Sequence, residues 1–139
     1  MYTAFSAGAM TLRPNSQGLY RARSRVRGVL RELDLSEDDR DRLLIAVGEA
    51  ISNAYLHGTH DPRFDSIRVA WTWANGRIMM TVKDNGSGFS KEMRIYPSER
   101  GLLARGIELM RAGVDEVGFS HDDGATVVLT KRLSPSVSE

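Results

Sequence analysis

SIRVAWTWANGRIMMTV, residues 66–82, is typical of two β-strands joined by a tight turn. Large apolar side chains alternate with small or polar ones up to Ala74, and the same two-residue period returns at Ile78. Asn75-Gly76 stands between the two runs, and this pair is favoured in turns whose residues take a positive φ. The stretch therefore predicts a β-hairpin.

Upstream of the hairpin, the apolar spacing changes to that of amphipathic helices. One helix is expected over residues 17–34. A second is expected to begin near Glu37, where Ser36 is a candidate N-cap ahead of an acidic first turn, and to end near Gly58. The first helix carries five arginines away from its apolar stripe, which form either a solvated face or a surface for a partner or a phosphate: Arg21, Arg23, Arg25, Arg27 and Arg31.

Downstream of the hairpin, residues 90–101 lack a clean period and include a proline, so we expect a loop there. Residues 107–114 have a short helical pattern, and residues 117–119 and 126–131 predict a closing hairpin. Residues 10–12 add a candidate edge strand. This order of elements indicates an α+β fold, a two-layer sandwich with the helices packed on one face of a mixed, mostly antiparallel sheet.

The composition is that of a single compact domain, residues 1–139, with 41% hydrophobic residues available for a core. A net charge of +1 gives no general attraction to nucleic acid or to an acidic membrane. The absence of cysteine excludes disulfides, thiolate zinc sites and cysteine nucleophiles. Because the sequence has neither a signal peptide nor an apolar run of about 20 residues, we expect a cytoplasmic protein.

Two residues of the second predicted helix are suited to nucleotide chemistry. Glu49 and Asn53 are four residues apart, so they project from one side of the helix, away from its apolar stripe. A carboxylate there can accept a proton, and an amide oxygen can bind Mg²⁺ without adding charge. Taken alone, such residues are usually solvated. His57 continues the same row, either as a helix cap or as a metal ligand.

Two glycine-containing segments are further candidates. The run DNGSGF, which begins at Asp84, follows a strand, and its glycines Gly86 and Gly88 permit close approach to a ligand. Asp84 can accept a hydrogen bond from an exocyclic amine such as that of adenine, although the run is also compatible with an ordinary turn. Gly106, at the expected start of the third helix, leaves N–H groups open to an anion, and Arg105 can bind phosphate oxygens.

In their order and spacing, these segments resemble the GHKL ATPase superfamily, specifically its anti-sigma-factor serine kinase family. EAISNAYLHG, residues 49–58, is similar to the N box of that family, and DNGSGF, residues 84–89, to its first glycine box. RGIELM, residues 105–110, is similar to the second glycine box, and GAT, residues 124–126, to the final box. The resemblance spans nearly the whole chain. Ala104 departs from it, because a second glycine often precedes the Arg-Gly pair.

The resemblance implies a Bergerat-type ATP-binding fold in which ATP lies between the helices and a lid of residues 90–105. It implies that Glu49 is the general base, that Asn53 binds Mg²⁺ and that Asp84 receives the adenine amino group. Further residues that it places around the nucleotide are His57, Gly86, Gly88, Phe89, Arg105, Gly106, Ile107 and Thr126, of which Thr126 would support Asp84.

The function implied by the resemblance is that of an ATP- and Mg²⁺-dependent serine-protein kinase in a partner-switching system. Such a protein phosphorylates an anti-anti-sigma protein of the STAS type and sequesters a sigma factor. A homodimer is implied as well, without independent support from the residue pattern. The alternative is a non-catalytic, ATP-responsive binding module that controls a phosphatase or another regulator without phosphoryl transfer.

Overall fold

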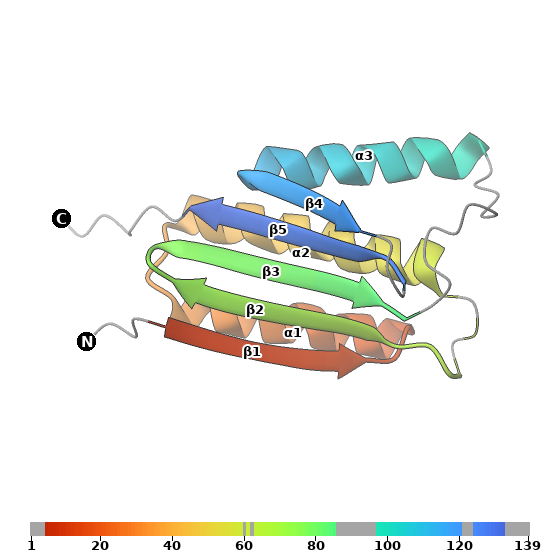
Figure 1. The fold of residues 1–139 in the computed structure, drawn as a ribbon, viewed down its shortest axis with the longest axis horizontal. Coiled ribbons are helices and arrows are strands. Elements are labelled where there is room, and N and C mark those ends of the chain that lie inside the picture. Colours follow the sequence, from red (N-terminus) through yellow and green to blue (C-terminus); the bar gives the residue numbers. More distant parts are fainter. Residues whose placement is uncertain (1–4, 60, 62, 86–96, 121–123, 133–139) are drawn as a thin grey trace.

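The computed structural model describes residues 5–59, 61, 63–85, 97–120 and 124–132, with the backbone alone for residues 5, 57, 58 and 97–104. They form two layers, a five-stranded sheet and three helices that cover one of its faces (Figure 1). The elements are β1 (Phe5–Leu12), α1 (Ser16–Glu32), α2 (Glu37–Gly58), β2 (Ile67–Ala74), β3 (Arg77–Asp84), α3 (Pro97–Gly113), β4 (Glu116–Ser120) and β5 (Thr126–Arg132). The expected two-layer α+β fold is confirmed.

The sheet has the strand order β1-β2-β3-β5-β4, and every pair among the described strands is antiparallel. The predicted hairpin is present as β2 and β3, and Asn75 and Gly76 between them have φ values of 55° and 70°. Trp71 is buried, and Trp73 is half-buried and packs against the hydrophobic core. The predicted edge strand is longer than expected, because β1 pairs with β2 over its full length.

The second helix occupies the middle of the helix layer, between α1 and α3 (Figure 1). Its expected N-cap is confirmed, since Ser36 Oγ accepts a hydrogen bond of 3.1 Å from the N–H of Asp39. The side of α2 that faces the sheet is buried, and Lys131 of β5 lies 3.5 Å from Asp39, with both side chains almost enclosed. The middle helix is therefore fixed to the sheet along its length, and its side chains are held in place for the site.

The loop expected over residues 90–101 is wrong for residues 97–101, which belong to α3. Pro97 is the first helical residue, a position where proline is well tolerated because the N–H there has no helical partner. The helix packs closely on α2, because a Cβ added at Gly113 would lie 2.8 Å from the carbonyl oxygen of Arg42. Residues 90–96 of the expected loop lie outside the described residues.

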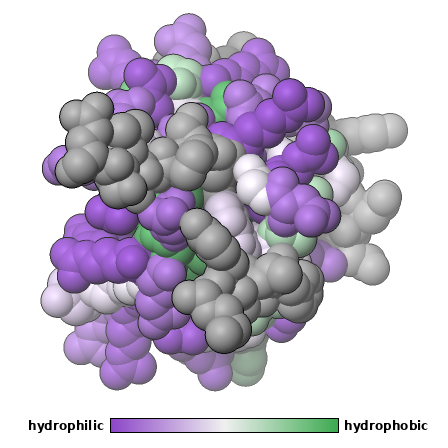
Figure 2. Space-filling view, turned by 90° about the vertical axis from the view of Figure 1, so that its left-hand side faces the viewer, coloured by the Kyte–Doolittle hydropathy of each residue, from purple (hydrophilic) through white to green (hydrophobic). Residues whose placement is uncertain are grey.

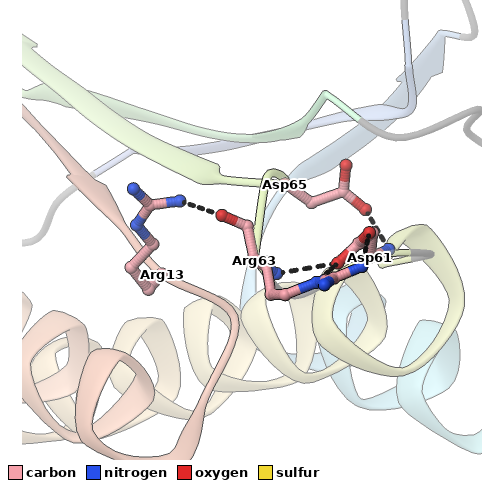
Figure 3. Close-up of polar contacts among 4 residues, drawn as sticks. All are labelled: Arg13, Asp61, Arg63 and Asp65. Atoms are coloured by element: carbon pink, nitrogen blue, oxygen red, sulfur yellow. Dashed lines mark hydrogen bonds and ion pairs between the residues drawn. The ribbon is translucent and has the colours of Figure 1, made fainter.

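The connection between α2 and β2 is organised by polar contacts (Figure 3). The guanidinium of Arg63 donates to the carboxylate of Asp61, and Asp65 accepts a hydrogen bond of 2.9 Å from the N–H of Asp61. Arg13 Nη1 donates to the carbonyl oxygen of Arg63 at 2.9 Å, which ties the connection to the end of β1.

Among the described helices, none is long and apolar enough to span a bilayer.

Candidate functional site

The candidate site begins on the side of α2 that faces α3. Asn53 is only 7% exposed and Glu49 is half-buried. A Cβ added at Gly106 would lie 3.2 Å from Glu49 Oε2 and 3.3 Å from both polar atoms of the Asn53 side chain. The structure therefore brings Gly106 against two residues that precede it by more than 50 positions, and a side chain at position 106 would be in tight contact with both.

Contrary to expectation, Gly106 does not lie at the start of a helix. It is the tenth residue of α3, so its N–H lies within the helical hydrogen-bond ladder. The prediction of an anion site at an exposed helix start is therefore wrong for this conformation. A small residue is favoured here by the close approach of α3 to Glu49 and Asn53.

Asp84, at the end of β3, forms the other part of the site and is 3% exposed. Its Oδ1 accepts a hydrogen bond of 3.2 Å from the N–H of Ala125, and its own N–H donates to the carbonyl oxygen of Ala125 at 3.0 Å. Gly124 has a φ of +99°, and a Cβ there would collide with the carbonyl oxygen of Asp84. The turn before β5 thus holds the carboxylate in a fixed orientation.

The structure does not place Thr126 beside the Asp84 side chain, contrary to the expected support. Thr126 is the register partner of Lys83, so these two side chains share the face of the sheet opposite to that of Asp84. The backbone N–H of Ala125 makes the supporting contact instead. No sequence pattern identifies Ala125, because a backbone donor can occur at any residue type except proline.

A small cavity joins the two parts of the site. Its volume is about 10 Å³, and it is lined by Ala50, Asn53, Ala54, Val82, Asp84, Ala125 and Val127. A space of that size holds roughly one water molecule, so the lining must open before a purine can enter. Asn53 of α2 and Asp84 with Ala125 of the sheet nevertheless line one cavity.

Asn53 is the candidate metal-binding residue of the site. The Asn53 side chain is 7% exposed and offers an amide oxygen and an amide NH₂ group to a ligand. The amide lies on the cavity wall and beside Glu49. Amide and carboxylate oxygens are the ligands that Mg²⁺ takes in proteins, so Asn53, with Glu49 adjacent, fits a metal-bound phosphate.

The remaining candidates are only partly covered by the structure. Gly86, Gly88 and Phe89 lie outside the described residues, and for His57 only its helical backbone in α2 is described. Arg105 is exposed on α3, and Ile107 is half-buried one turn before Met110. Two larger hollows, of about 250 and 300 Å³, lie elsewhere on the molecule and contain none of the candidate residues.

Comparison of the sequence with known proteins identifies a family of ATP-binding domains. Residues 12–131 match the family described as histidine kinase-like ATPase domain. Over 120 residues the chain is 32% identical to the serine-protein kinase RsbW of Bacillus velezensis, which covers 77% of this chain and 73% of the relative. Over 126 residues it is 28% identical to the anti-sigma F factor of Bacillus subtilis, with 83% of this chain and 84% of the relative covered.

Two solved structures share the fold. The RsbU and RsbW domains of a Mycobacterium tuberculosis protein superpose with a TM-score of 0.71 at 24% identity, covering 96% of this chain and 35% of that chain. The histidine kinase domain of a blue-light activated kinase from Erythrobacter litoralis superposes with a TM-score of 0.58 at 19% identity, covering 84% of this chain and 60% of that chain. The present chain thus spans about a third of the first structure. At these identities the likeness concerns the fold alone.

Proposed function

The chain belongs to the histidine kinase-like ATPase domain family, in its anti-sigma-factor kinase branch, and on that premise we propose that it is an ATP-dependent serine-protein kinase that also acts as an anti-sigma factor. Its substrate in this proposal is an anti-anti-sigma protein of the STAS type, and the partner that it sequesters is a sigma factor. The names of its relatives, a serine-protein kinase and an anti-sigma factor, support both halves of the proposal. Residues 1–139 act as one ATPase domain in the cytoplasm.

The observation that carries the proposal is the shared cavity of Asn53 and Asp84, with Glu49 next to Asn53. Asp84 is buried and orientated by Ala125, so its carboxylate is a fixed acceptor for the amino group of adenine. In this proposal the phosphates lie toward α3. Asn53 would hold Mg²⁺, which supplies charge neutralisation at the phosphates when it is bound.

Glu49 takes the role of general base in this arrangement. The hydroxyl oxygen of the substrate serine attacks the γ-phosphorus, the bond to the β–γ bridging oxygen breaks, and the serine proton moves to the Glu49 carboxylate. Because phosphoryl transfer depends mainly on positioning, the contact of α3 with Glu49 and Asn53 sets the geometry of the step. Residues 90–105 form the lid in this proposal, and nucleotide entry requires α3 to shift from α2 near Gly106.

The test separates binding from chemistry. Wild type, Glu49→Ala and Asp84→Asn are incubated with γ-labelled ATP, Mg²⁺ and a purified STAS-type protein from the same organism, and nucleotide affinity is measured in parallel. We expect Glu49→Ala to bind ATP normally and to transfer no label, and Asp84→Asn to bind at least about tenfold more weakly because one adenine contact is lost. Glu108→Ala, an exposed glutamate on α3, is the matched control and should behave as wild type.

The second candidate function is the ATP-responsive binding module without transfer. Close packing of α3 over Glu49 and Asn53 favours it, since this packing covers the groups that the chemistry needs. Strong ATP binding with no labelling of any STAS-type protein would support the module. Equal labelling by wild type and Glu49→Ala would remove Glu49 from the mechanism.

A further inference from the structure

The exposed face of α1 is strongly cationic. Residues 21–31 contain five arginines and neither aspartate nor glutamate. The helix lies at one side of the helix layer, with α2 on one flank only (Figure 1). Like charges four residues apart are neighbours on a helix surface and destabilise it, and α1 has three such pairs: Arg21–Arg25, Arg23–Arg27 and Arg27–Arg31. The face therefore favours an anion that residues 21–31 do not supply.

Two of these arginines have partners within the fold. Arg23 Nη2 donates a 3.0 Å hydrogen bond to Ser52 Oγ on α2. The Cζ atom of Arg25 lies 5.6 Å from the centre of the Trp71 ring. By contrast, Arg21 and Arg27 are exposed, and neither forms an ion pair with another described residue. The charges of these two side chains are thus available to a ligand.

Ser24 lies between these two arginines, three residues from each, and is exposed. Residues three apart on a helix are surface neighbours. Because helical side chains lean toward the N-terminus, Arg27 extends back toward Ser24, and Ser24 leans toward Arg21. One turn after Ser24, a Cβ added at Gly28 would meet nothing within 4 Å, so the space on that side of the hydroxyl is open. A phosphoryl group on Ser24 would have a guanidinium on either side.

Several features lower the cost of opening α1 around Ser24, which a kinase needs in order to reach the hydroxyl. Gly28 has a low helix propensity, and the like-charge pairs weaken the helix further. The end of the molecule at which α1 stops is mainly hydrophilic (Figure 2). Arg31 and Glu32, in the last turn, are both exposed. The hydroxyl is therefore exposed on a helix that is locally weak.

We propose that Ser24 is a phosphorylation site, modified by a separate serine kinase that recognises arginines before its target, and that Arg21 and Arg27 hold the resulting phosphoserine. Ser24 Oγ attacks the γ-phosphorus of ATP on that kinase, the bond to the β–γ bridging oxygen breaks, ADP leaves, and the serine proton passes to the base of the kinase. Arg21 and Arg23, three residues and one residue before Ser24, suit a substrate groove lined with carboxylates. The inference does not depend on kinase activity of this chain.

The modification acts where α1 is most cationic. A phosphoserine adds a charge of about −1.5 to −2 at pH 7 and three strong acceptor oxygens. Guanidinium groups bind phosphate oxygens through charge-assisted, often bidentate hydrogen bonds. Phosphorylation therefore offsets the repulsion among the arginines, and it makes α1 less attractive to an acidic partner.

The first experiment locates the phosphate. The folded chain is incubated with Mg²⁺, γ-labelled ATP and a purified serine kinase that requires an arginine three residues before its target, and the labelled residue is identified by mass spectrometry. We expect the label at Ser24, and at least about tenfold less label in Ser24→Ala and in Arg21→Gln. Ser16→Ala is the matched control, because Ser16 is also an exposed serine of α1 and follows Arg13 by three residues. This control should be labelled as wild type is.

The second experiment tests the arginine contacts. Phosphoserine is installed at position 24 during translation, so the arginine variants need not be kinase substrates, and its second pKa is followed by ³¹P NMR. Neighbouring guanidinium groups favour the dianion, so we expect a proton affinity about threefold lower than in an unfolded peptide of residues 20–28. Arg21→Gln/Arg27→Gln should return the pKa to that of the peptide. Arg31→Gln, two turns from position 24, should leave it low.

Four results would overturn the proposal. The first two are a folded chain that takes no label at Ser24, and a phosphoserine whose second pKa equals that of the peptide. The third is a lowered pKa that Arg21→Gln/Arg27→Gln leaves unchanged. The fourth is a purified acidic STAS-type protein that binds through Arg21 and Arg27 equally well with and without phosphoserine at position 24, which would assign these arginines to that partner instead.

Discussion

The two ends of the candidate site are built in different ways. The Asp84 end is made by the sheet, through two hydrogen bonds with Ala125 and a positive-φ glycine at Gly124. The end at Glu49 and Asn53 is made by one helix packing on another at Gly106, and among the described residues no hydrogen bond holds these two side chains. The first end is therefore preformed, whereas the second can change whenever α3 shifts.

This difference predicts which substitutions affect folding and which affect chemistry alone. Substitutions at the Asp84 end break backbone hydrogen bonds of the sheet, so they lower the stability of the fold. Changes at the α2–α3 contact are absorbed by a small helix displacement, which costs little stability but alters the position of a reacting group. Substitutions that lower the free energy of unfolding should thus also weaken ATP binding. Substitutions that slow phosphoryl transfer should leave the free energy of unfolding almost unchanged.

Gly124→Ala should have the largest effect. A side chain at a φ of +99° is strained, and its Cβ would collide with the carbonyl oxygen of Asp84. We expect a loss of about 3 kcal/mol or more in the free energy of unfolding, together with loss of ATP binding. Urea denaturation and nucleotide titration would measure both.

Gly28→Ala is the matched control for that experiment. A Cβ at Gly28, in the middle of α1, meets nothing within 4 Å, so alanine there should stabilise the chain by about 0.5–1 kcal/mol. If Gly124→Ala proved as stable as wild type, the Asp84 end would have to be adaptable, and the contrast between the two ends would disappear.

Gly106→Ala should separate transfer from stability. The new methyl group would press on Glu49 and Asn53 at 3.2–3.3 Å, while alanine improves helix propensity by about 1 kcal/mol. We expect unfolding to change by less than about 1 kcal/mol and single-turnover transfer to fall about tenfold. Unchanged transfer would mean that α3 leaves Glu49 in the active conformation.

Asn85→Ala tests the outer support of the Asp84 end. The side-chain oxygen of Asn85 accepts a 2.7 Å hydrogen bond from the N–H of Ser66, which joins the start of β2 to the end of β3. Because the site is exposed, we expect a loss of about 1 kcal/mol and a weakening of ATP binding by only a few fold. If Asn85→Ala lowered the free energy of unfolding as much as Gly124→Ala, the Asn85–Ser66 hydrogen bond, and not the Gly124 turn, would be what fixes the orientation of Asp84.

Asp61→Asn should have the smallest effect, confined to the connection shown in Figure 3. Hydrogen bonds from the Arg63 side chain and backbone lower the pKa of Asp61 from its ordinary value of 3.8. The stabilisation is present above that value and is lost as pH falls through the lowered pKa. The difference in stability between wild type and Asp61→Asn should therefore vanish in acid and become smaller as the salt concentration rises. Thermal denaturation at several pH values would measure this difference.

The sequence predicts the local elements well because their signals are local. Asn75-Gly76 and Ser36 act on residues within one turn of themselves, and both behave as expected. The start of α3 escapes prediction because residues 97–106 lack an apolar period. The support of Asp84 by Ala125 escapes it because a backbone N–H has no sequence signature.

The sequence by itself determines the hairpins, the first two helices, the family and the set of polar residues that a nucleotide would need. Each of these follows from short-range patterning or from the order of short motifs along the chain. Only the tertiary structure decides that Gly106 lies against Glu49 and Asn53, that Thr126 faces away from Asp84, and that the three described helices all lie on one face of the sheet. These outcomes depend on how whole helices and strands pack on one another. Packing brings together residues that are far apart in the chain, and short-range sequence patterns do not indicate such contacts.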